Sequence, residues 1–433
     1  MMKKARTIIV VFTASLFVSR AFAQSETLAD EHRIESRINQ LATYGANTPG
    51  VMKRVAFSEG DIQARKYIIR LMQDAGLTVT TDAAGNIFGR KKGRDNSLPY
   101  VAFGSHVDAV PNGGIYDGDL GVIGAIECID ILNQHHIETI HPLEVILFTD
   151  EEEGLIGSRA MTGHLSMDEL NNTMNCGKTL RQGINDVGGK TDELDKAKIE
   201  RGTIAAFIEL HIEQGNNLET AKTNIGIVEG IVGMKPYTIT INGKANHAGT
   251  TPMKQRKDAL LTAAKLIIAI NEAALSMNGR QVATVGQITV TPGGSNVIPG
   301  KAVISLDLRD LSAAKMDLLF NIIKQKADSI ALLNGTEITF IPKEVKEPVN
   351  TDKEIQLMIA KAAKNLNLTA IYLPSGALHD TQDMAKLAPS AMIFVPSKNG
   401  ISHSPDEYTS PEDMKNGINV LYKTILEADQ TFK

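Results

Sequence analysis

Residues 104–118 read Gly-Ser-His-Val-Asp-Ala-Val-Pro-Asn-Gly-Gly-Ile-Tyr-Asp-Gly and follow the apolar run Tyr100–Phe103. A short apolar run predicts a buried strand, and the glycines after it predict a turn. His106, Asp108 and Asp117 are then side chains of metal-ligand type at the carboxyl end of a strand, where open α/β sheets bind their ligands. This stretch therefore predicts an α/β protein with a metal-binding strand end.

Apolar strands and amphipathic helices alternate on both sides of this stretch. We expect helices over Ile62–Ala75, Leu120–Leu132, Lys353–Leu366 and Pro411–Asp429, and strands over Thr78–Thr80, Asn86–Gly89, Tyr100–Gly104, Leu143–Thr149, Ala205–His211 and Ala391–Val395. Alternation of this kind predicts a mixed, mainly parallel sheet with helices on both faces.

The pattern changes in the middle of the chain. Strands are expected over Tyr237–Asn242, Gln287–Thr291, Val303–Arg309 and Glu337–Pro342, and helices over Ala259–Ala274 and Lys315–Leu332. The order strand-helix-strand-strand-helix-strand predicts a ferredoxin-like α+β unit. We therefore expect an inserted domain at 229–347, within a catalytic domain made of 24–228 and 348–433.

The first residues have the pattern of a secretory signal peptide. A basic head at 3–6 precedes the apolar run Thr7–Val18 and an Ala-Phe-Ala exit at 21–23. A membrane anchor is the alternative, but a run of about a dozen apolar residues is too short to span a bilayer. We expect cleavage after residue 23 and an exported protein, periplasmic or secreted, that is not bound to a membrane.

Charge and cysteine content narrow the partners and the fold further. Cleavage would remove four basic and no acidic residues, which changes the formal net charge from −5 to −9. With no basic stripe, this charge argues against nucleic acid as a partner. Cys128 and Cys176 are the only cysteines. Export permits a disulfide, but Cys128 lies in an apolar helical pattern and is expected to be a buried thiol.

A second group of ligand-type residues follows the other expected strands. Leu143–Thr149 runs into Asp-Glu-Glu-Glu-Gly at 150–154, His211 ends a strand, and His403 lies in a loop after the last strand. A solvated loop and hydrogen-bonded structural histidines are the alternatives. However, carboxylates gathered at a strand end repel one another unless a cation neutralises them. Together with His106, the pattern indicates a metal centre, which suits Zn²⁺, with Mn²⁺ or Co²⁺ as alternatives.

Five motifs in order carry a resemblance to a known family: Gly-Ser-His-x-Asp at 104–108, Asp-Gly-x-x-Gly at 117–121, Asp-Glu-Glu at 150–152, Glu-Leu-His-Ile-Glu-Gln-Gly at 209–215 and Ser-His-Ser at 402–404. The chain resembles the dinuclear-metal amidohydrolases, the superfamily of aminoacylases and glutamate carboxypeptidase-type enzymes. His-Ile-Glu-Gln-Gly at 211–215 and His-Ala-Gly-Thr-Thr-Pro-Met at 247–253 resemble its hydantoinase/carbamoylase branch, with N-carbamoyl-L-amino-acid hydrolases and allantoate amidohydrolases. The resemblance covers essentially the whole mature chain.

The resemblance implies two divalent metal ions per subunit. It implies five ligands, with Asp117 bridging the ions: His106, Asp117, Glu152, His211 and His403. It makes Glu151 the general base, with Glu152/Glu153 as the other possible base/ligand pair, and Asp108 the carboxylate that orients the imidazole of His106. It also implies a homodimer in which the inserted domain is a lid and dimerisation domain. His247 from the partner's lid would then stabilise the oxyanion.

The resemblance further implies the contacts to a small-molecule substrate: Gln214, Asn296, Arg309, Gly376, Ala377 and His379. Gln214 would contact a ureido group and Arg309 a carboxylate, although a salt bridge to Asp307 or Asp310 is the alternative for Arg309. Leu378 stands where this branch has the middle glycine of Gly-Ala-Gly-His-Asp.

The expected activity is hydrolysis of N-carbamoyl-L-amino acids to the amino acid, carbon dioxide and ammonia. Three alternatives remain open from the sequence. These are an allantoate amidohydrolase, a metallo-exopeptidase for N-acyl amino acids or dipeptides, and a non-enzymatic periplasmic small-molecule binding protein.

Overall fold

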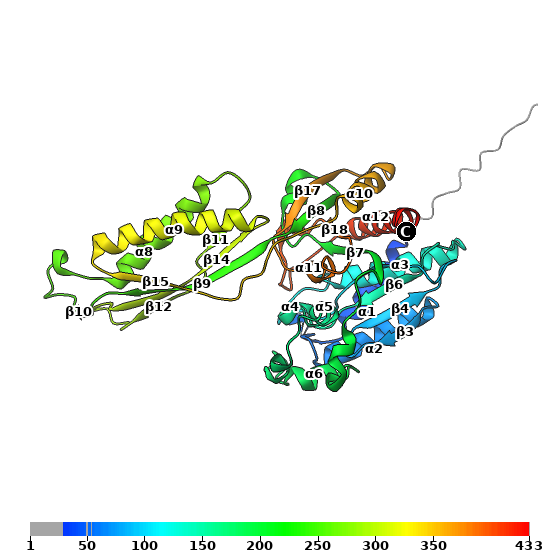
Figure 1. Cartoon of the computed structure of the whole chain (residues 1–433), viewed down its shortest axis with the longest axis horizontal. Coiled ribbons are helices and arrows are strands. Elements are labelled where there is room, and N and C mark those ends of the chain that lie inside the picture. The colour runs from blue at the N-terminus through cyan, green and yellow to red at the C-terminus, as the bar shows by residue number, and fades with distance from the viewer. Residues whose placement is uncertain (1–28, 49–50, 53, 433) are drawn as a thin grey trace, which may run out of the picture.

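The structure is a computed structural model and describes residues 29–48, 51–52 and 54–432, so the expected signal peptide lies outside the described residues. The two large sheets of the described residues are a nine-stranded one and a five-stranded one that extends away from it, and two pairs of short strands add to them (Figure 1). The expected site residues lie on both.

The nine-stranded sheet is mixed and parallel at its centre. Its order is β16-β8-β18-β7-β5-β6-β4-β3, with β17 also beside β8. The strands are β3 (Thr78–Thr81), β4 (Ile87–Lys91), β5 (Tyr100–Ser105), β6 (Leu143–Leu147), β7 (Ile204–Ile212), β8 (Ile225–Ile231), β16 (Val349–Asn350), β17 (Ala370–Ser375) and β18 (Ser390–Val395). β5 pairs in parallel with β6 and β7, and β18 pairs in parallel with β7. The prediction of a mixed sheet is therefore confirmed, but the sheet is less parallel than predicted, with four parallel and four antiparallel pairings.

Helices cover both faces of this sheet, as predicted. One face carries α1 (Glu31–Ala42), α2 (Glu59–Asp74), α3 (Asp119–Gln134), α10 (Lys353–Asn365) and α12 (Pro411–Thr431), and the other carries α5 (Ile156–Met161) and α11 (Thr381–Met384). β5 is buried on both sides, because Val101 and Phe103 pack into the first core and Ala102 into the second. Strands buried on both faces read as continuous apolar runs, which is how β5 appears in the sequence.

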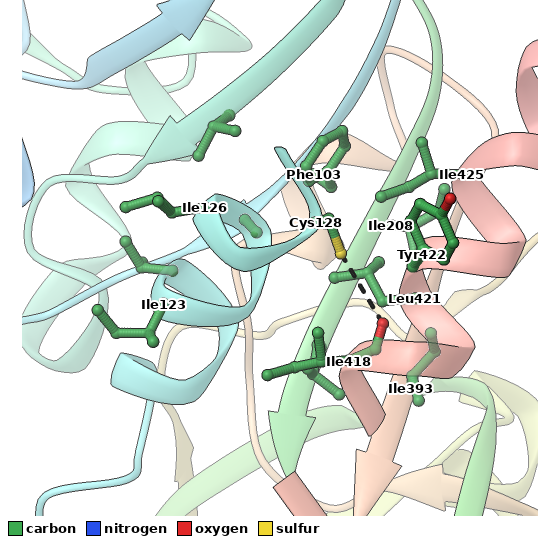
Figure 2. Close-up of a cluster of buried hydrophobic side chains, with 14 of the residues drawn as sticks. Phe103, Ile123, Ile126, Cys128, Ile208, Ile393, Ile418, Leu421, Tyr422 and Ile425 are labelled. Carbon is green, nitrogen blue, oxygen red and sulfur yellow. Dashed lines mark hydrogen bonds between the residues drawn. The ribbon is translucent and has the colours of Figure 1, made fainter. Parts of the chain in front are cut away.

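Cys128 lies in the larger core, between α3 and α12 (Figure 2). Its thiol is fully buried and donates to the carbonyl of Ile418 at 3.8 Å. Both cysteines are free, and Cys176 is partly buried. The expectation of a buried thiol at Cys128 agrees with this environment.

The five-stranded sheet has its own core. Its strands are antiparallel in the order β11-β14-β9-β15, with β12 also on β14. They are β9 (Gly233–Asn242), β11 (Val282–Thr284), β12 (Ile288–Thr291), β14 (Lys301–Asp310) and β15 (Glu337–Pro342), and α8 (Ala259–Ser276) and α9 (Ala313–Asn334) pack against them. We call this unit the lid. The four predicted strands and two predicted helices occur in the order expected for a ferredoxin-like unit, and β11 is an additional strand.

The border between the two units differs slightly from the prediction. β8 belongs to the nine-stranded sheet and ends at Ile231, so the predicted start at residue 229 falls within that strand. The reason is that β8 and β9 follow each other almost without interruption, which leaves no turn signal at the border.

α8 is apolar and long enough to span a membrane by composition alone, but 39% of it is buried within the structure.

Candidate metal centre

The ligand-type residues gather at one edge of the nine-stranded sheet. His106 follows β5, Glu151 and Glu152 follow β6, and His211 lies in β7. These strands are parallel neighbours, so their carboxyl ends meet at the same edge. The turn before α3 needs glycine, because Gly118 has a φ of 68° and a Cβ there would lie 2.5 Å from the ring of His106. That close approach allows the preceding Asp117 to reach the centre.

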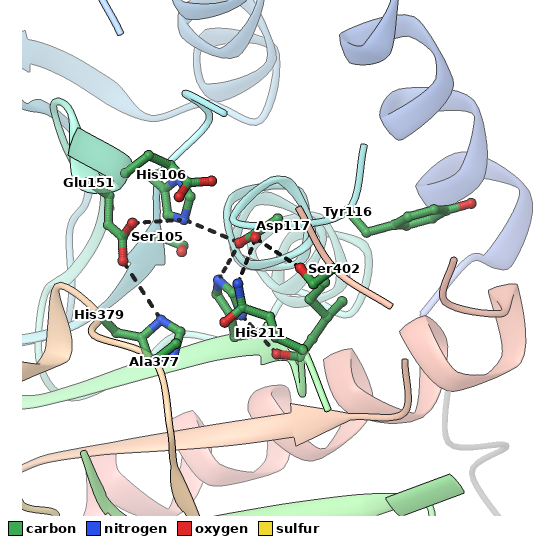
Figure 3. Close-up of polar contacts among 12 residues, drawn as sticks. Ser105, His106, Tyr116, Asp117, Glu151, His211, Ala377, His379 and Ser402 are labelled. Atoms are coloured by element: carbon green, nitrogen blue, oxygen red, sulfur yellow. Dashed lines mark hydrogen bonds and ion pairs between the residues drawn. The ribbon is translucent and has the colours of Figure 1, made fainter. Parts of the chain in front are cut away.

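Asp117 stands between two groups of ligand-type side chains (Figure 3). Its Oδ1 lies 3.1 Å from Nε2 of His211 and 3.7 Å from Nε2 of His106. Its Oδ2 lies 3.2 Å from Nε2 of His403, which is itself 3.4 Å from Oε2 of Glu152. We call His106, Asp117 and His211 the inner ligand group, and Asp117, Glu152 and His403 the outer ligand group. Within each group the ligand atoms lie within 4.8 Å of one another.

The inner group has the arrangement that a cation requires. Nε2 of His106 and Nε2 of His211 are buried and have no hydrogen-bond partner among the described residues. In the outer group, the same holds for Oε1 of Glu152. Each imidazole has its Nδ1 against a main-chain carbonyl, Asp108 O at 3.0 Å and Ile212 O at 2.9 Å. These contacts aim both Nε2 atoms at Asp117, as in metal sites. The residues present therefore fit divalent ions with nitrogen and oxygen ligands.

The three glutamates lie in the short helix α4 (Glu151–Gly154), which points their side chains in different directions. Glu151 lies with one oxygen 3.8 Å from Nε2 of His106 and the other 3.8 Å from Nδ1 of His379. Glu152 belongs to the outer group. Glu153 turns away, because its two oxygens accept the N–H of Asn175 at 3.1 and 2.9 Å. This geometry favours Glu151/Glu152 over Glu152/Glu153 as the base/ligand pair.

The carboxyl groups of the centre are crowded and buried. Burial raises the pKa of Glu151 well above its ordinary value, and the charges of Glu152 and Asp380 raise it further. Burial and the charge of Asp117 act in the same direction on the pKa of Glu152. Burial also opposes ionisation of Asp117, but the close imidazoles of His211 and His403 hold its pKa well below the ordinary range. Such a concentration of carboxyl groups is stabilised when cations share the site.

The carboxylate of Asp108, predicted to orient the imidazole of His106, makes its hydrogen bonds to a neighbouring turn. Its Oδ1 lies 3.7 Å from Nδ1 of His106, and its main-chain carbonyl holds that imidazole instead. The carboxylate accepts the N–H groups of Glu151 and Glu152 at 3.2 and 3.1 Å. The physical reason is that the first N–H groups of a helix lack partners within it, and this side chain supplies one. Asp108 therefore positions the Glu151–Glu152 turn.

A cleft of about 820 Å³ opens above the centre. Arg309 reaches it from β14 of the lid, donating through Nη1 to the carbonyl of Gly376 at 2.8 Å and through Nη2 to Asp307 at 3.0 Å. Both the predicted position and the alternative salt bridge to Asp307 are thus present. Gln214 donates to Oδ2 of Asp117 at 2.7 Å, and its own Oε1 is buried without a partner among the described residues.

The remaining predicted contacts on the catalytic side also line this region. Ala377 lines the same cleft, and Gly376 lines the adjoining recess beside Gln214. His379 lies on the buried floor, with Nε2 3.0 Å from Oγ of Ser375. His379 therefore contacts Glu151 and exposes little of its own surface to the cleft. Leu378 also lines the cleft.

His247 and Asn296 are not brought to the centre. His247 lies in β10 (Asn246–His247), and Asn296 directly precedes β13 (Val297–Ile298). These two strands pair at the end of the lid farthest from the nine-stranded sheet (Figure 1). The two residues are neighbours, since Ala248 N–H donates to Asn296 O at 2.9 Å, and both side chains are exposed. They line neither the cleft nor the adjoining recess.

The main chain around His247 determines which nitrogen of the ring can donate. Nδ1 accepts the N–H groups of Gly249 and Thr250 at 3.0 and 3.2 Å. A neutral imidazole whose Nδ1 is an acceptor carries its proton on Nε2. The lid therefore presents an Nε2–H donor at its tip.

Two buried carboxylates beside the centre were not predicted from the sequence. Glu209 accepts the hydroxyl of Ser105 at 2.7 Å and the N–H of Thr381 at 3.2 Å. Glu407 accepts the N–H groups of the turn before α3. An acidic residue within the apolar strand β7 was a signal for Glu209, whereas Glu407 lies in a polar loop that gives no such signal.

Comparison with known proteins agrees with this site. The sequence profile of the peptidase family M20/M25/M40 matches residues 102–427. The chain is 40% identical over 403 residues to the N-carbamoyl-L-amino acid amidohydrolase of Geobacillus stearothermophilus. The match covers 92% of this chain and 98% of that protein. It is 37% identical over 414 residues to the ureidoglycolate hydrolase of Arabidopsis thaliana, covering 93% and 87%.

A solved structure gives the same result. The hydantoinase/carbamoylase family amidase from Burkholderia multivorans superposes with a TM-score of 0.85 at 34% identity, covering 93% of this chain and 98% of that one. Among the alternatives of the sequence analysis, these relatives support an amidohydrolase activity, and a purely binding role has no support. The chain belongs to the peptidase family M20/M25/M40, in its hydantoinase/carbamoylase branch, and is a metal-dependent amidohydrolase that acts on non-peptide C–N bonds.

Proposed function

We propose that the protein hydrolyses N-carbamoyl-L-amino acids with two divalent metal ions, Zn²⁺ first, with Mn²⁺ or Co²⁺ as alternatives. One observation carries the proposal: the guanidinium of Arg309 and the outer ligand group line the same cleft, beside Gln214, whose Oε1 has no partner among the described residues. An N-carbamoyl amino acid has a carboxylate for Arg309 and a ureido NH₂ that can donate to Gln214. The similarity to two ureido hydrolases points to the same substrate class.

The ions would lie in the inner and outer ligand groups, joined by Asp117. When bound, they supply Lewis-acid polarisation of the ureido carbonyl and lower the pKa of the attacking water. Glu151 takes the proton from that water and delivers it to the leaving nitrogen. Its raised pKa suits a group that must hold the proton between the two steps. The C–N bond breaks to give the amino acid and carbamate, which decomposes to carbon dioxide and ammonia.

Arg309 and Gln214 orient the substrate. The guanidinium is already held by Asp307 and the carbonyl of Gly376, so little freedom is lost when it binds a carboxylate. Gln214 is fixed at its amide nitrogen by Asp117, which leaves Oε1 to accept from the substrate. A fixed donor at the developing oxyanion is worth about 3 kcal/mol in comparable sites, and Nε2–H of His247 is our candidate for it.

We infer that this donor comes from a second copy of the chain. His247 and Asn296 lie at the remote tip of the lid, so a homodimer in which each tip closes the partner's cleft would complete both sites. The outer face of the lid supports association, since Ile268 and Leu275 of α8 are 60% and 78% exposed. We likewise propose that residues 1–23 direct export to the periplasm or the medium.

Complementation between two inactive variants tests the shared site. In a mixture of His247→Ala and Glu151→Gln chains, half of the dimers are mixed, and each mixed dimer has one intact site. We expect subunit exchange to restore about a quarter of the wild-type activity. Ammonia release before and after exchange measures this. If the mixture stays as inactive as either variant alone, His247 does not act across subunits.

A substrate panel tests the reaction itself. N-carbamoyl-L-amino acids, allantoate, N-acetyl amino acids and dipeptides are compared for ammonia and amine release at equal protein concentration. We expect kcat/KM to be highest for N-carbamoyl-L-amino acids. Allantoate is the second candidate, because it combines ureido groups with a carboxylate that Arg309 can bind. Preferred cleavage of dipeptides would contradict the proposal.

A further inference from the structure

Glu407 is a buried carboxylate to which the proposed mechanism gives no task. Glu407 is only 5% exposed, and its side chain lies between the loops that carry Asp117 and His403. Its Oε1 accepts the N–H groups of Tyr116 and Asp117 at 3.0 and 3.2 Å. Its Oε2 accepts the hydroxyl of Ser402 at 2.7 Å. One side chain thus connects the loop of the bridging carboxylate with the loop of an outer ligand.

The space for this carboxylate exists because residue 114 is glycine. A Cβ at Gly114 would lie 2.1 Å from Oε1 of Glu407 and 2.3 Å from its carboxyl carbon. No larger residue fits at 114 unless Glu407 moves away. The carboxylate and the turn before α3 are therefore closely packed against each other.

Ser402 lies between Glu407 and Asp117. Its Oγ is 2.7 Å from Oε2 of Glu407 and 3.3 Å from Oδ2 of Asp117. A hydroxyl has one proton, and the shorter contact assigns that proton to Glu407. Oδ2 of Asp117 therefore accepts from Gln214 but not from Ser402, and keeps a lone pair for the outer ligand group.

The two ligand groups differ in how much they depend on this arrangement. His106 and His211 are almost fully buried at strand ends, and each Nδ1 is fixed by a main-chain carbonyl. His403 lies in a loop with a left-handed φ of 54°, and its side chain is 49% exposed. The neighbouring Ser402 is bound to Glu407. The outer group therefore depends on Glu407 through the loops of both Asp117 and His403, whereas the two histidines of the inner group are held without it.

We propose that Glu407 is a positioning residue for the outer metal ion. It holds the turn of Asp117 and the Ser402–His403 loop in register, and it keeps the proton of Ser402 away from the bridging carboxylate. The inference rests on the proposed two-ion function. Residues that orient metal ligands typically contribute 10–100-fold to affinity, so we expect a loss of about that size at the outer position only.

The test uses Glu407→Gln, which keeps the shape of the side chain. The glutamine amide would donate to Ser402, and the serine proton would then pass to Oδ2 of Asp117, where it competes with the metal. Asp406→Asn is the matched control, because Asp406 is exposed in the same loop and loses the same charge. Ser402→Ala is a second variant that removes the hydroxyl alone.

Metal-free protein is titrated with Co²⁺ in competition with a chromophoric chelator, and the visible absorption of bound Co²⁺ is recorded. A His403→Ala variant assigns the outer step. We expect two steps in the wild type and in Asp406→Asn. In Glu407→Gln and Ser402→Ala the inner step should be unchanged and the outer step weakened, by about 10–100-fold in Glu407→Gln.

Two results would overturn the role of Glu407 and leave the two-ion function intact. One is equal weakening of both steps, and the other is a Glu407→Gln isotherm that matches that of Asp406→Asn. If the wild type bound no Co²⁺, the two-ion function and this inference would fail together. Circular dichroism of each variant shows whether it is folded, and a folded Ser402→Ala with a wild-type outer step would contradict the inference independently.

Discussion

Glu151→Gln is expected to lower kcat by about 10²–10⁴-fold while the metal content and KM stay close to those of the wild type. The amide cannot take a proton from water, yet it has the same size and makes no contact within the outer ligand group. The pKa of Glu151 is raised by burial and by neighbouring carboxyl groups, so the carboxyl group is suited to taking up a proton and returning it.

Glu153→Gln is the matched control for this prediction. Glu153 lies two positions further in the same acidic run, and its oxygens are occupied by the N–H of Asn175. We expect Glu153→Gln to keep kcat within about twofold of the wild type, as for substitutions away from the reacting atoms. Steady-state kinetics and metal analysis of both variants decide the matter. If Glu152→Gln kept its metal and lost only turnover, while Glu151→Gln remained active, the alternative base/ligand pair would be correct.

Asp117→Asn is expected to release bound metal from both positions and to reduce activity by a factor on the order of 10³ or more. One oxygen of Asp117 faces His106 and His211 and the other faces His403, so the loss of its charge affects both groups. The backbone N–H contacts of residue 117 to Glu407 do not depend on the side chain, and we expect the fold to persist.

Metal content after dialysis measures this effect. The Asp406→Asn variant is again the control, because it removes one negative charge from the neighbouring loop. We expect it to keep the full metal content. An Asp117→Asn protein that retained two ions per chain would show that Asp117 does not bridge them.

The centre of the fold was predictable because its strands are buried on both faces. β5, β6 and β7 read as mostly apolar runs, and α3 shows the three-to-four spacing of a packed helix. β8 was missed because Gly226, Glu229 and Gly230 interrupt its apolar pattern. β17 was missed because its six residues include Pro374, which argues against a strand.

The helix α1 also escaped prediction. Its buried positions Ile34, Ile38 and Leu41 are few and stand among charged and polar residues. Its position depends on side-chain pairs with α3, such as Arg33 with Glu127 at 2.6 Å. Pairs that form between segments distant in sequence have no local periodicity, so they were visible only in the structure.

The types of the site residues could be predicted, but their division of labour could not. Ligand-type residues at successive strand ends indicated a metal centre, and the family resemblance implied the residues of both ligand groups and a substrate contact for Arg309. The sequence could not reveal that Asp108 supports the Glu151–Glu152 turn, because that contact depends on the start of a helix of one turn. It could not reveal Glu407 either, since the partners of that carboxylate are main-chain N–H groups.

The central claim is that this chain is an amidohydrolase for ureido carboxylates that works only with divalent metal ions in the Asp117 centre. The most direct measurement is release of ammonia and amino acid from an N-carbamoyl-L-amino acid, by chelator-treated protein before and after addition of Zn²⁺, Mn²⁺ or Co²⁺. We predict no turnover before addition and equimolar release of both products afterwards, with two ions bound per chain. Equal turnover with and without bound metal, or no cleavage of any ureido carboxylate by the reconstituted protein, would contradict the account.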